Sequence, residues 1–342
     1  MDERMEINIL DYKLKLTSIK KGQNVISKYT HALLDILFLR NARLQTQYSF
    51  VNVTETDQDY SVVCEESCLP LLKGCGEELI VVDGIWVPLV VSVGLEGIST
   101  AGISKIAHSV IIPLADFQIS VYCLSTYKTD YVLVKESDLP AACRVLAHDF
   151  KITEENSTES SEIKIDRSEI PVRKDAAVPR LITHRYTSPE NTFYVTSMDR
   201  CSVETQALAL IDCLFYSDSY PHGAGEEPFL SLSMVDQDIS LVLDEKLLSR
   251  FPPNVLFNTK ECWKMVKIGD MPEGLGFVIH GVVAQMSDPI ASAQISEYYI
   301  STYYYGHTLV PLDQIENVMS ILEQRKNSAM AEVAPVESLH PV

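Results

Sequence analysis

Apolar and polar positions along this chain alternate between the two-residue period of strands and the longer period of helices. In the first half, the pattern predicts strands at 6–18, 47–54, 60–66, 86–93, 119–126 and 130–137. Apolar residues at helical spacing predict helices at 26–39, 103–117 and 139–150. The order strand–helix–strand–strand–helix begins the ferredoxin-like βαββαβ pattern. The first half therefore predicts two small α+β units.

The second half of the chain repeats the first. Residues 113–139 read PLADFQISVYCLSTYKTDYVLVKESDL and residues 289–315 read PIASAQISEYYISTYYYGHTLVPLDQI, with eleven of 27 positions identical. Further matches at nearly the same spacing are Trp86 with Trp263, 33–38 with 210–215, and 57–66 with 236–245. Self-similarity at a fixed spacing indicates an internal duplication.

We therefore predict an α+β fold of four ferredoxin-like units, arranged as two tandem pairs. The expected boundaries are 1–80, 81–152, 184–256 and 257–326. Residues 153–183 are rich in Ser and Glu and have the composition of a solvated linker. The Ala/Glu/Pro-rich residues 327–342 predict a disordered tail.

Charge and hydropathy narrow the classes of partner. The chain has 28 Lys and Arg against 47 Asp and Glu, a formal net charge of −19. Nucleic acids and anionic membranes attract basic proteins, so neither is expected as a partner. The longest apolar stretch, 79–98, is interrupted by charged residues, Gly and Pro, so we expect no membrane insertion. The acidic N-terminus has no signal-peptide pattern, and the expected location is the cytosol.

Enzyme and metal motifs are not found in the sequence. The eight cysteines form no CxxC pair, and the trio Cys64, Cys68 and Cys75 has neither zinc-site spacing nor a fourth ligand. We expect free thiols, no metal and no cofactor. The sequence also has no GxSxG, HExxH or Walker motif, which argues against an enzyme.

Two segments are candidates for binding an anion. The glycine-rich stretch KIGDMPEGLGFVIHG (267–281) follows a predicted strand and opens a predicted helix. Glycines allow close approach of a ligand, and the first N–H groups of a helix favour a carboxylate. The strand ends SVYCLSTYKTD and SEYYISTYYYG offer hydroxyl groups as well. An ordinary turn and ordinary strand packing remain open as alternatives.

Longer blocks of the sequence resemble the CASTOR family, the cytosolic arginine sensors upstream of TOR complex 1. The matching segments are 29–39, 54–63, 104–139, 209–217, 275–285 and 295–311. The resemblance implies four ACT domains, which have the βαββαβ pattern, and kinship with the regulatory domains of aspartate kinases. It implies no catalysis.

The resemblance also implies where an amino acid binds, between the second and fourth ACT domains. By this resemblance, Ser120 and Val121 hold the ligand carboxylate, and a loop with Gly276, Phe277 and Gly281 folds over it. The strand end beside the ligand side chain matches Thr302, Tyr303 and Tyr305.

Three acidic residues of the family are replaced here. Val278 and Ile279 replace two acids of the loop, one of which binds the α-amino group, and Gly306 replaces an aspartate near the side chain. In the repeat, Asp130 is the equivalent of Gly306. A buried guanidinium without a carboxylate costs several kcal/mol. We therefore expect weak arginine binding or none, unless Asp270, Glu273 or Glu297 compensates. A different, uncharged ligand stays open as an alternative.

Protein partners are implied by the same resemblance. The surface that binds the GATOR complex matches Tyr127, Lys128 and Asp130, with Lys128 in place of a glutamine. The homodimer contact matches Ile211 and Tyr216. The leading hypothesis is a non-enzymatic sensor or adaptor that inhibits GATOR and restrains TOR complex 1. The alternatives are a ligand-independent interaction protein with a vestigial pocket, and an ACT regulatory subunit of an amino-acid metabolic enzyme.

Overall fold

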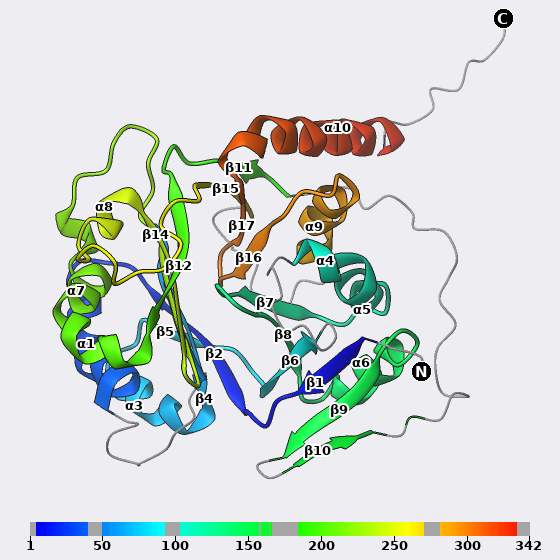
Figure 1. Cartoon of the computed structure of the whole chain (residues 1–342), viewed down its shortest axis with the longest axis horizontal. Coiled ribbons are helices and arrows are strands. Elements are labelled where there is room, and N and C mark those ends of the chain that lie inside the picture. The colour runs from blue at the N-terminus through cyan, green and yellow to red at the C-terminus, as the bar shows by residue number, and fades with distance from the viewer. Residues whose placement is uncertain are drawn as a thin grey trace, which may run out of the picture.

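Two β-sheets face each other in this chain, and each is covered on its outer side by helices (Figure 1). The structure is a computed structural model and describes residues 5–39, 50–92, 103–156, 159–163, 165, 184–269 and 281–333. Each sheet is built from both halves of the chain, so the repeated units are interleaved.

The first sheet joins strands of the first and third predicted units. Its strand order is β5 (Leu79–Val81), β2 (Leu14–Lys20), β4 (Asp59–Glu65), β3 (Phe50–Glu55), β13 (Leu230–Val235), β14 (Asp238–Asp244) and β12 (Phe193–Asp199). The helices packed on it are α1 (Val25–Leu34), α3 (Leu69–Lys73), α7 (Val203–Phe215) and α8 (Glu245–Leu248). The halves meet where β3 pairs with β13, and Asn52 Nδ2 donates there to Ser231 Oγ (2.9 Å) and Ser233 Oγ (3.0 Å).

The second sheet joins the second and fourth predicted units. Its strand order is β10 (Glu159–Glu162), β9 (Lys151–Asn156), β1 (Glu6–Ile9), β6 (Trp86–Ser92), β8 (Asp130–Lys135), β7 (Val121–Ser125), β16 (Tyr298–Ser301), β17 (Gly306–Pro311), β15 (Trp263–Ile268) and β11 (Tyr186–Thr187). The helices on its outer face are α4 (Ser104–Ile106), α5 (Ile112–Asp116), α6 (Leu139–Leu146), α9 (Val282–Ser292) and α10 (Ile315–Val333).

Alternating strands bury apolar residues on both faces of each sheet. One cluster of apolar side chains lies between each sheet and its helices, and a third lies between the two sheets. The repeated tryptophans Trp86 and Trp263 both belong to the cluster between the sheets. Single bridges from Leu14 to Trp86 and from Phe193 to Trp263 connect the sheets at this level. The burial of these aromatic side chains fixes the two sheets against each other.

The predicted strands and helices are found, with three corrections. The expected strand 6–18 is two strands, because a tight turn at Asp11, closed by Tyr12 N–H donating to the Leu10 carbonyl (2.9 Å), separates β1 from β2. The strand β1 then pairs with β6 and β9, so it joins the sheet of the predicted second unit.

The start of the expected linker is also ordered. Residues 151–156 and 159–162 form β9 and β10, and Ile152 is buried in the core beneath the second sheet. Composition missed this strand because three of its six residues, Lys151, Glu154 and Glu155, are charged. At the other end, α10 continues to Val333, beyond the expected start of the tail. The unit boundaries themselves stay a prediction.

Candidate functional site

The predicted ligand residues lie along the seam between β7 and β16, where the second and fourth units pair. Ile300 is opposite Leu124. Cys123 N–H donates to Ser301 Oγ (3.0 Å), and Tyr299 N–H donates to Ser125 Oγ (2.9 Å). Ser125 and Ser301 are equivalent in the repeat, and so are Cys123 and Tyr299. The seam therefore has an internal two-fold relation.

The seam brings the start of β7 together with the turn that follows β16. Ser120 is buried and precedes β7, which begins at Val121. Thr302, Tyr303 and Tyr305 follow β16 in the turn that leads to β17. Because β7 and β16 are antiparallel, the start of β7 and this turn lie at the same end of the strand pair.

The backbone N–H and the hydroxyl of Thr302 form hydrogen bonds within its own turn. Its N–H donates to the Tyr305 carbonyl (2.8 Å), and its hydroxyl donates to the same carbonyl (2.9 Å). In return, Tyr305 N–H donates to Thr302 Oγ1 (3.2 Å). Thr126 makes the same set of bonds with Thr129 in the equivalent turn. Thr126 and Thr302 belong to the two Ser-Thr-Tyr (STY) segments, 125–127 and 301–303. Both threonines therefore stabilise the turn that follows their strand.

Gly306 begins β17 at a position where no side chain fits. A Cβ built on Gly306 would overlap the hydroxyl of Tyr299 and approach Ile268 Cγ2 at 3.0 Å. Tyr299 is buried, and burial raises the pKa of its hydroxyl well above the ordinary value. The space beside Gly306 thus holds a neutral phenol. Sequence reasoning did not single out Tyr299, since a tyrosine in a strand is ordinary.

The glycine-rich segment is described only at its two ends. Gly276, Phe277 and Ile279 lie outside the described residues. Gly281 adopts φ 79° and caps the N-terminus of α9, a left-handed conformation that glycine adopts without strain. Gly269 packs against the turn between β16 and β17, where a Cβ on Gly269 would lie 2.6 Å from Tyr305 Cδ1. Both glycines have a structural reason to be there.

Glu297 is the buried acid nearest to this seam in sequence. It is the repeat equivalent of Val121 and is fully buried. Burial raises the pKa of the Glu297 carboxyl to about 8. At neutral pH it is therefore mostly protonated and offers little negative charge to a guanidinium. Asp270 and Glu273 lie outside the described residues.

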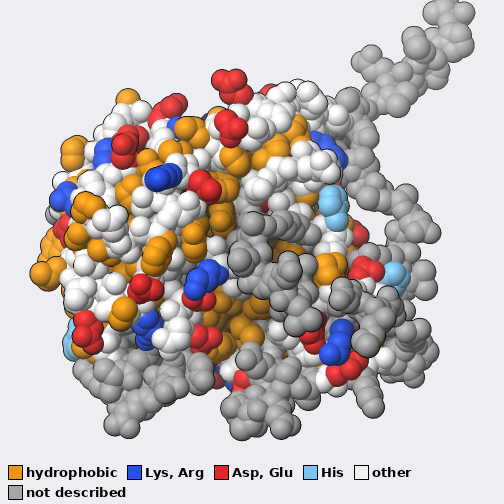
Figure 2. All heavy atoms as spheres, in the orientation of Figure 1, with side chains coloured by type: hydrophobic (Ala, Val, Ile, Leu, Met, Phe, Trp, Pro, Cys, Tyr) orange, Lys and Arg blue, Asp and Glu red, His pale blue; other side chains and the backbone are white. Residues whose placement is uncertain are grey.

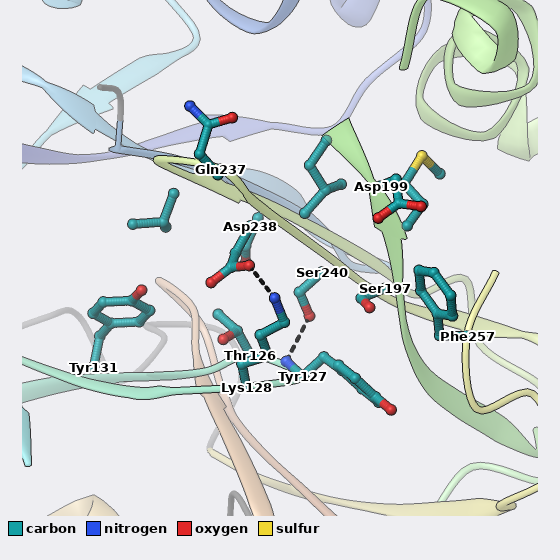
Figure 3. Close-up of a pocket in the computed structure, with 14 residues that line it drawn as sticks. Thr126, Tyr127, Lys128, Tyr131, Ser197, Asp199, Gln237, Asp238, Ser240 and Phe257 are labelled. Carbon is teal, nitrogen blue, oxygen red and sulfur yellow. Dashed lines mark hydrogen bonds and ion pairs between the residues drawn. The ribbon is translucent and has the colours of Figure 1, made fainter. Parts of the chain in front are cut away.

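Two of the three predicted partner residues, Tyr127 and Lys128, line a cavity of about 380 Å³, which we call the Lys128 cavity (Figure 3). Tyr127 N–H donates to Ser240 Oγ on β14 (2.8 Å), and the Lys128 ammonium pairs with Asp238. Asp130, the first residue of β8, is not among the residues that line this cavity. The structure therefore brings Tyr127 and Lys128 together at this cavity and places Asp130 opposite Ser125, next to the β7–β16 seam.

The predicted dimer residues lie on α7. Tyr216, at the end of α7, is 57% exposed, and Ile211 is half-buried. The same helix also exposes Leu208, at 82%. Figure 2 shows apolar side chains along the left edge of the molecule, where α7 and α1 lie in Figure 1. An exposed apolar helix face of this kind is typical of a protein interface.

The described residues contain no group of three or more His, Cys, Asp or Glu that could hold a metal ion. All eight cysteines are free thiols, as expected. In the part of the chain that the structure describes, no helix combines the length and apolar character needed to cross a membrane.

Comparison with protein families gives three matches along the chain. Residues 13–72 match the cytosolic arginine sensor for mTORC1 subunit 1 N-terminal domain, and residues 184–260 match the cytosolic arginine sensor for mTORC1 subunit 1/2, ACT-like. Residues 83–148 and 258–324 match the ACT domain. The ACT-type α+β fold is therefore confirmed, whereas the number of four such domains stays a prediction.

Relatives match along nearly the whole chain. "Cytosolic arginine sensor for mTORC1 subunit 1" of Mus musculus is 37% identical over 333 residues, which cover 95% of this chain and 98% of the relative. The human protein of the same name is 37% identical over 332 residues, covering 94% and 98%. Among solved structures, an aspartate kinase from Synechocystis aligns with 98% of this chain and 58% of its own, at 14% identity and a TM-score of 0.35.

Proposed function

We infer a function from the premise that this chain belongs to the family of the cytosolic arginine sensors for mTORC1. We propose that it is a non-enzymatic amino-acid sensor or adaptor of the cytosol that restrains mTORC1 signalling by binding and inhibiting the GATOR complex. The observation that carries this proposal is the 37% identity over 95% of the chain to a protein with that name. The site described above refines it at two points.

The first refinement concerns arginine. We propose that this chain binds L-arginine weakly or not at all. The hydroxyl of Tyr299 fills the space beside Gly306, so no carboxylate at that position faces a ligand. Val278 and Ile279 add no charge in the loop, and Glu297 is mostly protonated at neutral pH. An uncompensated guanidinium in such a site is costly.

The second refinement concerns the partner surface. We propose that Tyr127 and Lys128 contact the GATOR complex, with Asp130 supporting the turn behind them. Tyr127 is held by its backbone bond to Ser240, so its side chain is presented from a fixed turn. Lys128 adds a cation and is bound to Asp238 at the surface. Partner binding should therefore depend more on salt than in relatives without this cation.

One binding experiment tests both refinements. The purified full-length chain captures the purified GATOR complex, with and without millimolar L-arginine. We expect capture to change less than about twofold with arginine and to fall at least about tenfold in Tyr127→Ala. Phe117→Ala, which removes a partly exposed aromatic side chain that does not line the Lys128 cavity, is the control.

Each result decides one point. Release of GATOR by arginine would contradict the proposal of weak arginine binding. Failure of the wild-type chain to capture GATOR would contradict the adaptor function. Recovery of an amino-acid kinase from cells instead would support the alternative of an ACT regulatory subunit.

A further inference from the structure

The Lys128 cavity lies where the turn between β7 and β8 meets the first sheet (Figure 3). Its floor includes a row of three buried serines on neighbouring strands, which we call the serine row: Ser197, Ser240 and Ser233. Ser197 is directly opposite Ser240, and Ser240 is directly opposite Ser233. Three hydroxyls therefore lie side by side at the bottom of an open cavity.

The internal repeat provides a second copy of this arrangement in the first half of the chain. Ser18 and Ser61 are the equivalents of Ser197 and Ser240 and are also directly opposite each other. The turn after β16 lies over them, because Tyr303 N–H donates to Ser61 Oγ (3.0 Å), as Tyr127 N–H does to Ser240 Oγ. The two sites thus have the same framework.

In the first half, a carboxylate from the chain itself occupies this framework. Asp59 is fully buried. Its Oδ2 accepts from Ser18 Oγ (2.6 Å) and Ser61 Oγ (2.7 Å), and its Oδ1 accepts from Thr56 Oγ1 (2.7 Å). The Ser61 hydroxyl thus accepts a hydrogen bond from Tyr303 N–H and also donates one to the Asp59 carboxylate. The paired serines are therefore a built carboxylate site, already filled.

In the second half, the equivalent carboxylate is elsewhere. Asp238 corresponds to Asp59, but it pairs with Lys128 and its side chain is 43% exposed. Thr56, which holds Asp59 inward, corresponds to Val235, which has no hydroxyl. Lys128, Val235 and Asp238 line the cavity. In the first half, the buried Asp59 occupies the equivalent place. The second site therefore keeps the paired serines but not the internal carboxylate.

Charge and wall chemistry restrict what fits there. Lys128 supplies one positive charge, whereas Asp199 and Asp238 supply two negative charges. A simple carboxylate anion would face this net negative charge, but a zwitterion would not, because its ammonium offsets the excess acid. Val235 and the half-exposed Phe257 supply an apolar wall.

We propose that the Lys128 cavity binds a free zwitterionic α-amino acid with an apolar side chain. The ligand carboxylate takes the place that Asp59 has in the first half and accepts from Ser197 and Ser240. Its ammonium faces Asp199, and its side chain packs on Phe257. This site is separate from the β7–β16 seam and does not depend on the function proposed above.

Calorimetry on the purified full-length chain tests the site directly. The probes are L-valine, L-leucine, L-isoleucine, L-methionine and L-phenylalanine, together with the amide and the des-amino acid of whichever binds. We expect at least one amino acid to bind, and both analogues to bind at least about tenfold more weakly, since each lacks one charge.

Two variants locate the binding. Ser197→Ala removes one donor and should weaken binding about tenfold. Val235→Thr supplies the hydroxyl that Thr56 has in the first half, so Asp238 can turn inward and exclude the ligand. Ser18→Ala, in the filled copy of the site, is the matched control and should leave the affinity unchanged. Urea unfolding of each variant shows that it is folded.

The proposal is overturned if none of the five amino acids binds. It is equally overturned if binding survives both Ser197→Ala and Val235→Thr, because the ligand would then lie elsewhere, for example at the β7–β16 seam. Neither measurement involves a protein partner, so failure here leaves the proposed GATOR contact untouched.

Discussion

Single residues decide the electrostatics of the seam between β7 and β16. Gly306 leaves a space that the Tyr299 hydroxyl fills, and Glu297 is an acid in a place where its repeat equivalent is Val121. Burial favours the neutral form of both Tyr299 and Glu297. Tyr299 and most of Glu297 are therefore neutral at neutral pH, and the nearby Asp130, opposite Ser125, adds to the raised pKa of Glu297.

Glu297 makes the stability of the fold depend on pH. The folded chain keeps the Glu297 proton until the pKa of about 8, whereas the unfolded chain releases it near the ordinary value of 4.5. The raised pKa therefore lowers the free energy of unfolding as pH rises from 4.5 to 8. Relative to Glu297→Gln, wild type should lose on the order of 4 kcal/mol over this range, measured by urea unfolding.

Glu136→Gln, at an exposed position, is the control for this titration and should follow the wild-type profile. Parallel pH profiles for wild type and Glu297→Gln would show that Glu297 is ionised in the folded chain, and would remove one reason for expecting weak arginine binding.

At the scale of elements, the paired strands β7 and β16 hold the second and fourth units together. The seam has one backbone bridge, from Ile300 to Leu124, and two serine hydroxyls that accept backbone N–H groups. Ser125 and Ser301 are equivalent by the repeat, so each supports the strand of the other unit. Side chains therefore replace part of the usual ladder between the strands.

Removing either serine should leave a buried N–H group unsatisfied. We expect Ser125→Ala and Ser301→Ala each to lower the free energy of unfolding by about 1–3 kcal/mol, and by similar amounts. Chemical denaturation measures both, with the exposed Ser137→Ala as a control that should stay within about 0.5 kcal/mol of wild type. A large effect at one serine alone would mean that the seam is not symmetric in energy.

At the scale of the whole molecule, the two halves are interlocked. Strands β3 and β13 pair across the first sheet, and β7 and β16 pair across the second. A ligand at either seam thus contacts both halves of the chain. Such a ligand shifts partner binding only if it binds one arrangement of the halves more tightly than the other.

The exposed apolar face of α7 predicts a homodimer. Two copies related by a two-fold axis would cover Leu208 and Tyr216, which a monomer leaves in water. Light scattering should give twice the chain mass of 38.3 kDa for wild type. Tyr216→Asp and Leu208→Asp should shift the chain to monomer, whereas Leu312→Asp, at another exposed leucine, should not. A wild-type monomer at micromolar concentration would contradict this prediction.

The sequence alone determined the repeat and most of the order of strands and helices. These features depend on local periodicity and on residues close together in the chain, so they can be read without knowing the fold. The family also followed from the sequence, because its long blocks of matching residues are far more specific than any short motif.

Only the tertiary structure decided which strands pair and which groups meet. A period-two pattern shows that a strand has a buried face, but it does not identify the neighbour of that strand. Hence the pairing of β1 with β9, the Tyr299 hydroxyl beside Gly306, and the inward Asp59 against the outward Asp238 were all unforeseen. Each depends on residues far apart in sequence, whose contacts are selected by packing across the two sheets.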